Sequence, residues 1–254
     1  MTAQETVAWV REAEASGTGA LGTPSTGASN GEGSPWFALA SFSRPHFPLT
    51  APRRWIDHST RIGVRPPAVP AGGDAWEHPM SVGMRRGFQA DAMDAAETER
   101  ARIGYAACVS YLDEVIGDLI ARLDATGALD NTVIVYTSDH GEMAGEHGVW
   151  WKNGWYEGCT RVPLIVSLPE QRQGARPATR SRTPVGQINL FPTLCALAGV
   201  EAPDDLDGVD VSAAVRGESE PPDRPIMCDA LTPRWGPGTE FRMLRYKQIG
   251  RAHV

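Results

Sequence analysis

The residues best suited to chemistry are Asp139 and His140, which follow the apolar run 132–138. A carboxylate oxygen and an imidazole nitrogen can both ligate a divalent cation, and Gly141 lets the backbone turn away sharply. A strand-end aspartate can also make a turn or cap a helix. Taken alone, the pair leaves both interpretations open.

Lys152 lies among Trp150, Trp151, Trp155 and Tyr156. A lysine in such a setting can act as a point charge on an oxyanion, because electrostatic interactions are stronger where water is scarce. Taken alone, however, this stretch favours a surface lysine whose stem covers the aromatic rings. The rings could hold a quaternary ammonium group by cation–π attraction, or they could pack in the core.

His46 stands between Pro45 and Phe47-Pro48, directly after the apolar run 36–42. Rigid placement suits a donor of a proton to a leaving group or of a hydrogen bond to a substrate. Arg44 could bind a small anion. Both residues are also compatible with an ordinary loop.

The segment His140-Gly-Glu-Met-Ala-Gly-Glu-His147 differs from the zinc-protease pattern His-Glu-x-x-His. The spacing would not place both imidazoles one helical turn apart on one face. We therefore expect His147 to be a loop or supporting residue, and Glu142 and Glu146 to be solvated or structural rather than catalytic.

The elements that position these residues alternate between strand and helix patterns. Apolar residues recur at helical spacing from about residue 95 to 126, before Gly127, and the next strand follows at 131–138. A helix between strands indicates an α/β fold with a mostly parallel sheet flanked by helices. The other predicted elements are a helix at 5–15, strands at 36–42 and 162–168, a helix at 187–198, and turns with a short helix at 204–217.

The composition narrows the class of protein. The 254 residues carry a net charge of −7 and show no basic stripe, which argues against a nucleic-acid partner. The four cysteines are widely spaced, so neither a zinc ribbon nor a disulfide framework is indicated, and a reducing, cytoplasmic location is favoured. No run has membrane-spanning length and no secretion signal is visible.

Three blocks resemble the sulfatase family of the alkaline-phosphatase superfamily. TSDHGEMAGEHGVWWKNGWYEGCTRVPLIV, residues 137–166, resembles the family's metal-and-lysine segment and is most similar to choline sulfatases and related bacterial enzymes. SFSRPHFP, residues 41–48, resembles the strand-then-histidine segment. INLFPTLCALAGV and LDGVDVSAAVRG, within 188–217, are similar to later segments of the family.

The resemblance implies an alkaline-phosphatase-like fold and hydrolysis of a small anionic sulfate ester. Asp139 and His140 would bind a divalent cation, with Ca²⁺ favoured and Mn²⁺ or Mg²⁺ as alternatives. Lys152 would contact the sulfate, and His46 would assist the leaving oxygen. Arg44 and Trp151 would contact the substrate. No membrane partner is expected, and a homo-oligomer is left open.

The family's nucleophile, a formylglycine formed within Cys/Ser-x-Pro-x-Arg, and its N-terminal Asp-Asp metal pair are both absent from the sequence. This predicts a catalytic domain that is incomplete at both ends, with the formylglycine in a missing N-terminal part. Residues 1–240 would be the C-terminal portion of that domain and 241–248 the start of a C-terminal subdomain. Residues 249–254 match a translated sequencing adapter, so His253 is assigned no function.

Three functional hypotheses follow. The first is a fragment of a metal-dependent sulfuric ester hydrolase, inactive as it stands because this chain has no nucleophile. The second is a phosphonate or phosphodiester hydrolase of the same superfamily, because a tetrahedral phosphoryl group needs similar positively charged groups to bind its oxygens. The third is a catalytically inactive anion-binding module.

Overall fold

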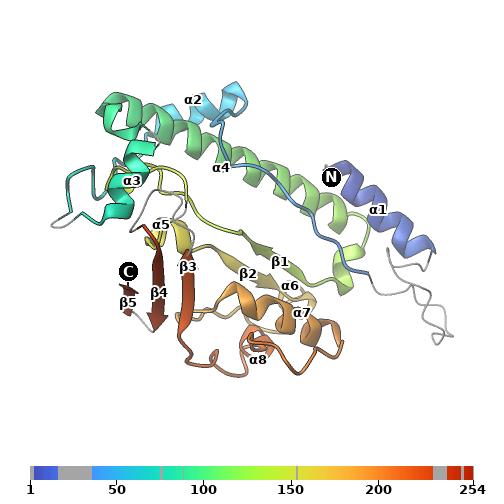
Figure 1. Cartoon of the computed structure of the whole chain (residues 1–254). Helices are drawn as coiled ribbons and strands as arrows, with labels where there is room; N and C mark the ends of the chain where they lie inside the picture. The colour runs from blue at the N-terminus through green and yellow to red at the C-terminus, as the bar shows by residue number, and fades with distance from the viewer. Residues whose placement is uncertain are drawn as a thin grey trace. The chain divides into compact units, whose positions relative to one another are not determined.

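The computed structural model describes residues 3–16, 36–74, 77–87, 89–152, 154–230, 239–246 and 249–253. They divide into two compact units, which are labelled by their elements in Figure 1. Unit 1 comprises Met1–Val64 and Glu99–Thr132, and unit 2 comprises Arg65–Thr98 and Val133–Val254.

Unit 1 is helical. Its elements are α1 (Ala3–Ser16), α2 (Arg53–Ile62), most of α4 (Ala95–Asp124) and the 3-10 turn η2 (Ala128–Asn131), and the predicted helices at 5–15 and 95–126 are confirmed. The α4 helix begins with a capping box, in which Asp94 and Glu97 each accept a hydrogen bond from the other's main-chain N–H. Arg54 and Trp55 both donate to Glu114, which joins α2 to α4.

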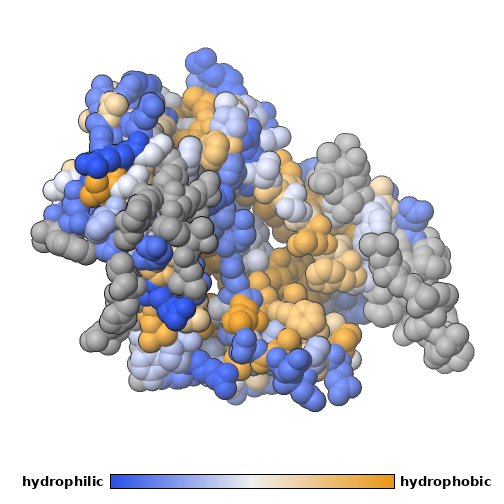
Figure 2. Space-filling model, viewed as in Figure 1, coloured by the Kyte–Doolittle hydropathy of each residue, from blue (hydrophilic) through white to orange (hydrophobic). Residues whose placement is uncertain are grey.

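The predicted strand at 36–42 is wrong, because these residues form no regular secondary structure. Phe37 and Leu39 are 70% and 76% exposed, and apolar residues, drawn in orange, reach the visible surface in Figure 2. A strand exists only where its main-chain groups find a ladder partner. None of the described strands pairs with this run, so its apolar composition alone does not make it a strand.

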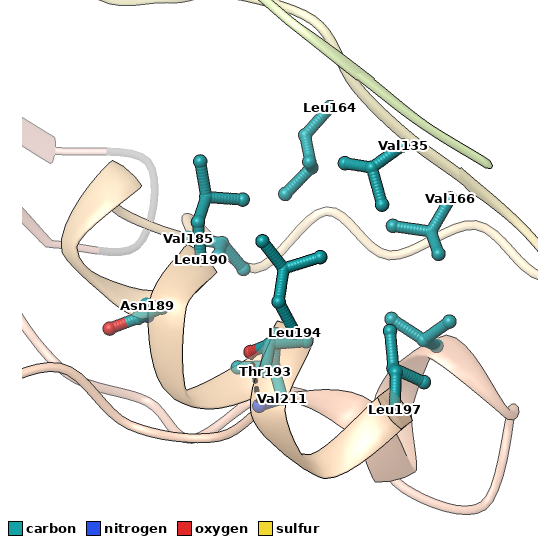
Figure 3. Close-up of a pocket in the computed structure, with 11 residues that line it drawn as sticks. Val135, Leu164, Val166, Val185, Asn189, Leu190, Thr193, Leu194, Leu197 and Val211 are labelled. Atoms are coloured by element: carbon teal, nitrogen blue, oxygen red, sulfur yellow. Dashed lines mark hydrogen bonds between the residues drawn. The ribbon is translucent and has the colours of Figure 1, made fainter. Parts of the chain in front are cut away.

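In unit 2, the predicted strands at 131–138 and 162–168 are confirmed as β1 (Ile134–Thr137) and β2 (Leu164–Ser167). They pair antiparallel, with Ile134 opposite Ser167. The predicted helix at 187–198 is the 3-10 turn η4 (Gln187–Asn189) continued by α7 (Leu190–Ala198). Figure 3 shows Leu190 and Leu194 of α7 facing Val135 and Leu164 across an apolar layer.

A second sheet and the main core complete unit 2. The strands β3 (Ile226–Ala230), β4 (Phe241–Tyr246) and β5 (Ile249–His253) pair antiparallel with β4 in the middle. The buried core joins β4 to α3 and to the loop after β1; its members are Met80, Met84, Met143, Val149, Cys159, Phe241 and Met243. The remaining short elements are α3 (Pro79–Gly87), η1 (Ala90–Ala92), η3 (Glu146–Gly148), α5 (Glu157–Thr160), α6 (Pro169–Arg172) and α8 (Ser212–Val215). The α8 helix is the short helix predicted within the turns at 204–217.

The mostly parallel sheet expected from the sequence is not confirmed, because every pairing among the described strands is antiparallel. The expectation came from a helix, now α4, lying between two strand patterns. The pattern before that helix, 36–42, is not a strand, so the strand–helix–strand unit that requires a parallel crossover is lacking in the described residues. Among those residues, no helix combines the length and the apolar character needed to cross a membrane.

Candidate active site

The turn after β1 presents Asp139 and His140 together. Ser138 Oγ donates to the carbonyl oxygen of His140 at 2.8 Å, and the main-chain N–H of His140 donates to Asp139 Oδ1 at 3.0 Å. The Asp139 side chain is 84% exposed and that of His140 is 31% exposed. The turn therefore orders both side chains while leaving the carboxylate open to a ligand.

The imidazole of His140 is oriented by its own backbone. Its Nδ1 lies 2.8 Å from the carbonyl oxygen of Gly141, and since a carbonyl can only accept, Nδ1 is the donor. In the neutral ring, Nε2 then carries the lone pair, and it lies 3.3 Å from Asp139 Oδ2. Two lone-pair atoms this close fit a shared cation, and fixing the histidine tautomer by a hydrogen bond at the other nitrogen is typical of metal sites.

Gln187, at the start of η4, holds the same turn through side-chain hydrogen bonds to its main chain. Its Nε2 donates to the carbonyl oxygens of Ser138 and Asp139 at 2.6 and 2.9 Å. Gln187 was not predicted from the sequence. The only available signal was its place at the beginning of the predicted helix 187–198, which does not indicate where its side chain points.

Gly141 is required by a close backbone approach. A Cβ atom at this position would lie 2.0 Å from the carbonyl oxygen of Gly158, and the Gly141 N–H donates to the carbonyl oxygen of Cys159 at 2.7 Å. Gly141 therefore serves the sharp turn that the sequence predicted, and it also lets the turn after β1 pack closely against α5.

Glu142 ties the loop that leads to Lys152. Its Oε1 accepts hydrogen bonds from the main-chain N–H groups of Ala144 and Trp151, at 3.1 and 2.5 Å. The Met143 N–H donates to the carbonyl oxygen of Trp151 at 2.9 Å. Glu142 is therefore structural, as predicted, and it fixes the residue that precedes Lys152.

Most of the aromatic residues around Lys152 are core residues. Trp150 is 7% exposed, and Trp155 packs edge-on against Phe241 at a centroid distance of 5.3 Å. Tyr156 stacks on His147 at 4.0 Å. These contacts favour the core-packing interpretation over a quaternary-ammonium cage. Trp151, next to Lys152, is half-buried.

His46 and Arg44 belong to a loop of unit 1. Arg44 donates from Nη1 to the carbonyl oxygens of His46 and Pro48, at 2.9 and 2.8 Å, and from Nη2 to Thr50 Oγ1 at 2.9 Å. His46 is exposed, stacks on Phe47 and donates from Nδ1 to the carbonyl oxygen of Phe47 at 2.9 Å. Arg44 thus holds the loop that presents His46, and the Nδ1 of His46 is committed to the Phe47 carbonyl.

The predicted site residues therefore fall into two groups. Asp139, His140, Trp151 and Lys152 belong to unit 2, whereas Arg44 and His46 belong to unit 1. No set of three or more His, Cys, Asp or Glu side chains within the described ranges is arranged to hold a metal ion.

The sulfatase family model matches residues 21–200 of the chain, which include the turn after β1, Lys152 and the His46 loop. The chain belongs to the sulfatase family. This confirms the family indicated by the three sequence blocks.

Among curated sulfatases, the choline-sulfatase of Rhizobium meliloti (strain 1021) is 36% identical over 188 residues, which are 72% of this chain and 36% of that protein. The iduronate 2-sulfatase of Homo sapiens is 32% identical over 203 residues, covering 67% of this chain and 37% of that protein. The chain thus spans little more than a third of the length of these two relatives.

Among solved structures, a phosphonate monoester hydrolase from Silicibacter pomeroyi matches with a TM-score of 0.70 and 25% identity. The match covers 86% of this chain and 47% of that one. This likeness confirms an alkaline-phosphatase-like α/β fold, while the parallel sheet itself stays a prediction.

Proposed function

We propose that this chain supplies the metal-ligand turn and the anion-binding lysine of a sulfuric ester hydrolase acting on a small sulfate ester. The observation that carries the proposal is the 3.3 Å approach of His140 Nε2 to Asp139 Oδ2, with Nδ1 committed to a backbone carbonyl. Similarity to the Rhizobium meliloti choline-sulfatase supports sulfate as the ester group.

Asp139 and His140 would bind a divalent cation, which sulfatases generally use. Calcium is our first choice, with Mn²⁺ and Mg²⁺ as the alternatives that the family resemblance implies. When bound, the cation would neutralise charge on the sulfuryl oxygens. The two side chains would hold it, and Gln187 keeps their backbone in place.

Lys152 would place an ammonium group on a sulfate oxygen, where a preorganised positive charge stabilises the charge that develops in the transition state. His46, as an imidazolium, would donate the proton on Nε2 to the leaving oxygen and become neutral, while its Nδ1–H stays bonded to the Phe47 carbonyl. Arg44 would position that loop and offer its remaining N–H groups to the substrate. Trp151 would cover the substrate beside Lys152.

The nucleophile in this proposal is a formylglycine contributed by a segment outside the 254 residues, since the sequence contains no Cys/Ser-x-Pro-x-Arg. The chain by itself is therefore expected to be inactive. Reading the genomic DNA that adjoins the coding sequence tests this step directly. An adjoining reading frame without that motif would contradict it.

The test of function uses the enzyme expressed from the complete reading frame, with choline sulfate and an aryl sulfate as substrates. Asp139→Asn and His140→Gln should each lower kcat/KM by about 100-fold, the upper range for disturbing a metal centre. The matched controls are Asp204→Asn, an exposed aspartate of unit 2, and His58→Gln of unit 1; both should keep native activity. Native activity in the Asp139 and His140 variants would refute the proposal.

A second candidate is a phosphonate monoester hydrolase, favoured by the TM-score of 0.70 to the Silicibacter pomeroyi enzyme. Assaying the same leaving group as its sulfate ester and as its phenylphosphonate ester separates the two. A higher kcat/KM for the phosphonate would replace the first proposal with the second.

The third candidate, an inactive anion-binding module, is favoured by the lack of the nucleophile motif in this sequence. It predicts that the 254-residue chain binds inorganic sulfate without turning over any ester, and that no longer reading frame exists. Isothermal titration with sulfate, together with the genomic DNA, decides between this candidate and the first.

A further inference from the structure

The segment from Glu146 to Lys152 is braced by residues 68–74 of unit 2, a stretch of bends and turns. Glu146 Oε2 accepts hydrogen bonds from the main-chain N–H groups of Ala68 and Val69, at 2.8 and 3.1 Å. The His147 N–H donates to the carbonyl oxygen of Val69 at 2.5 Å. Glu146 is therefore structural, as the sequence predicted, and it acts together with its neighbour His147.

His147 adds a side-chain brace to the same stretch. Its Nδ1 lies 2.9 Å from both carboxylate oxygens of Asp74, and its ring stacks on Tyr156 with an interplanar angle of 17°. The His147 and Asp74 side chains are only 20% and 19% exposed. Arg85 Nη1 donates to the His147 carbonyl oxygen at 3.3 Å, so this residue is held at its N–H, its ring and its carbonyl.

The backbone here is strained in a way that needs such bracing. Among the described residues, four that are not glycine have positive φ, and three of them, Ala144, His147 and Trp151, fall in the eight residues before Lys152. Positive φ in a residue with a Cβ atom persists only when surrounding contacts impose it, and such residues cluster at functional sites. The hydrogen bonds that brace His147 and Trp151 are the contacts that impose positive φ here.

Lys152 itself depends on this backbone for its position. Its side chain makes no hydrogen bond or ion pair with any residue in the described ranges, whereas Val149 and Trp150 just before it are buried. A lysine side chain has four rotatable carbons and no fixed geometry of its own. Its placement must come from the main chain on which it stands.

We infer that Asp74 and His147 are positioning residues that hold the ammonium of Lys152 at the anion site. The inference rests on the proposed function for the role of Lys152, but the restraint on Lys152 stands on the geometry alone. The pair acts by locking the left-handed turn at His147, so that the chain leaves the buried Val149–Trp150 pair in one direction.

The sequence offers a direct readout, because Lys152 and Lys247 are its two lysines. In the 254-residue chain, both are acylated with an N-hydroxysuccinimide ester, and the ratio of Lys152 to Lys247 labelling is followed by mass spectrometry. His147→Gly removes the brace and relieves the positive φ at the same time. Asp74→Ala removes the brace while leaving the His147 backbone unchanged.

Both variants should raise the labelling ratio by about fivefold, because loss of one side-chain hydrogen bond shifts a local opening equilibrium by that order. His147→Asn should keep a ratio within about twofold of native, since asparagine tolerates the left-handed region and offers an amide N–H near the Nδ1 position. Asp204→Ala, an exposed aspartate of the same unit, is the matched control. A urea unfolding curve shows which variants fold. If His147→Gly does not fold, the test rests on Asp74→Ala.

An unchanged or lower ratio in Asp74→Ala would overturn the inference. Failure of the proposed function gives a different result: Lys152→Ala in the complete enzyme would keep native turnover, while the labelling ratios above would still change. In an active complete enzyme, Asp74→Ala should lower kcat by about tenfold or more, with KM changing less. Rescue by His147→Asn distinguishes positioning of Lys152 from a general loss of stability.

Discussion

Gln187 donates from Nε2 to the main-chain carbonyl of Asp139 at 2.9 Å, and to that of the preceding Ser138 at 2.6 Å. One amide group thus holds two successive carbonyls of the turn that carries both expected metal ligands. Because the Asp139 side chain is largely exposed, its direction depends on this backbone support rather than on packing. Gln187 therefore supports the turn that would hold the proposed cation.

Replacing Gln187 tests that support. Gln187→Ala should weaken Mn²⁺ or Ca²⁺ binding by about 10- to 100-fold, the range found for residues that orient metal ligands from behind. Titration of the complete enzyme with each metal, followed by isothermal calorimetry, measures the change. Gln173→Ala, an exposed amide of the same unit, is the control and should bind as the native protein does. Equal affinities in the two variants would show that Gln187 only stabilises the loop.

Gly141→Ala is expected to be strongly destabilising. Its Cβ would meet the Gly158 carbonyl oxygen at 2.0 Å, a backbone atom that cannot move aside cheaply, so we expect a loss of about 3 kcal/mol or more. Gly174→Ala is the matched control: it has positive φ and open space, and should lose about 1–2 kcal/mol. Urea unfolding compares them, and a smaller loss at Gly141 than at Gly174 would contradict the close approach.

Much of the local structure could be predicted from the sequence. The long periodic pattern before Gly127, the short apolar runs around 134 and 164, and the helix near 190 all appear where they were expected. Periodicity records which face a segment buries, so it locates elements well. It does not record which strands pair, and this is why 36–42 was wrongly assigned and why the antiparallel pairing of β1 with β2 was not foreseen.

The candidate site was predictable in part for a similar reason. Asp139 and His140 are adjacent in sequence, so their proximity in the turn follows from chain connectivity. The supports reach across long sequence distances: Gln187 contacts the turn from 48 residues away, and Asp74 contacts His147 from 73 residues away. A single sequence carries no signal for such pairs, because polar residues in loops have many compatible partners.

Ionisation of the Cys159 thiol should make the free energy of unfolding depend on pH in the alkaline range. Burial raises its pKa to about 11, above its ordinary value. Below the ordinary value both folded and unfolded states keep the proton, so the thiol changes nothing. At higher pH the unfolded state ionises first, and stability should fall by up to about 1.4 kcal/mol per pH unit until the folded pKa is reached.

Urea unfolding from pH 8 to 11 measures this slope, and Cys159→Ala should reduce it. Cys195→Ala, at a half-buried cysteine of the same unit, is the control and should keep the native slope. Burial also raises the pKa of Cys108 and Cys228, so part of the slope will remain in Cys159→Ala. If the slope is identical with and without Cys159, its thiol is not held in an apolar environment when folded.

Arg85 is expected to stabilise unit 2 through its planar fork of donors. It donates from Nη2 to Glu77 at 2.7 Å and from Nε to Asp91 at 3.1 Å, in addition to the His147 carbonyl, and its side chain is only 7% exposed. Arg85→Lys keeps the charge but cannot reach three acceptors with one ammonium group. We expect a loss of about 2 kcal/mol, below the value for a fully buried pair because Asp91 is 56% exposed.

The neighbouring Arg86 provides the matched control, because it is exposed on the same helix α3. Arg86→Lys should change the free energy of unfolding by less than about 0.5 kcal/mol. Since Arg85 also holds the His147 carbonyl, Arg85→Lys should raise Lys152 acylation, although less than Asp74→Ala does. Equal stability of the two lysine variants would mean that the Arg85 ion pairs contribute nothing net, and the bracing of His147 would then have to come from Asp74 and Val69 alone.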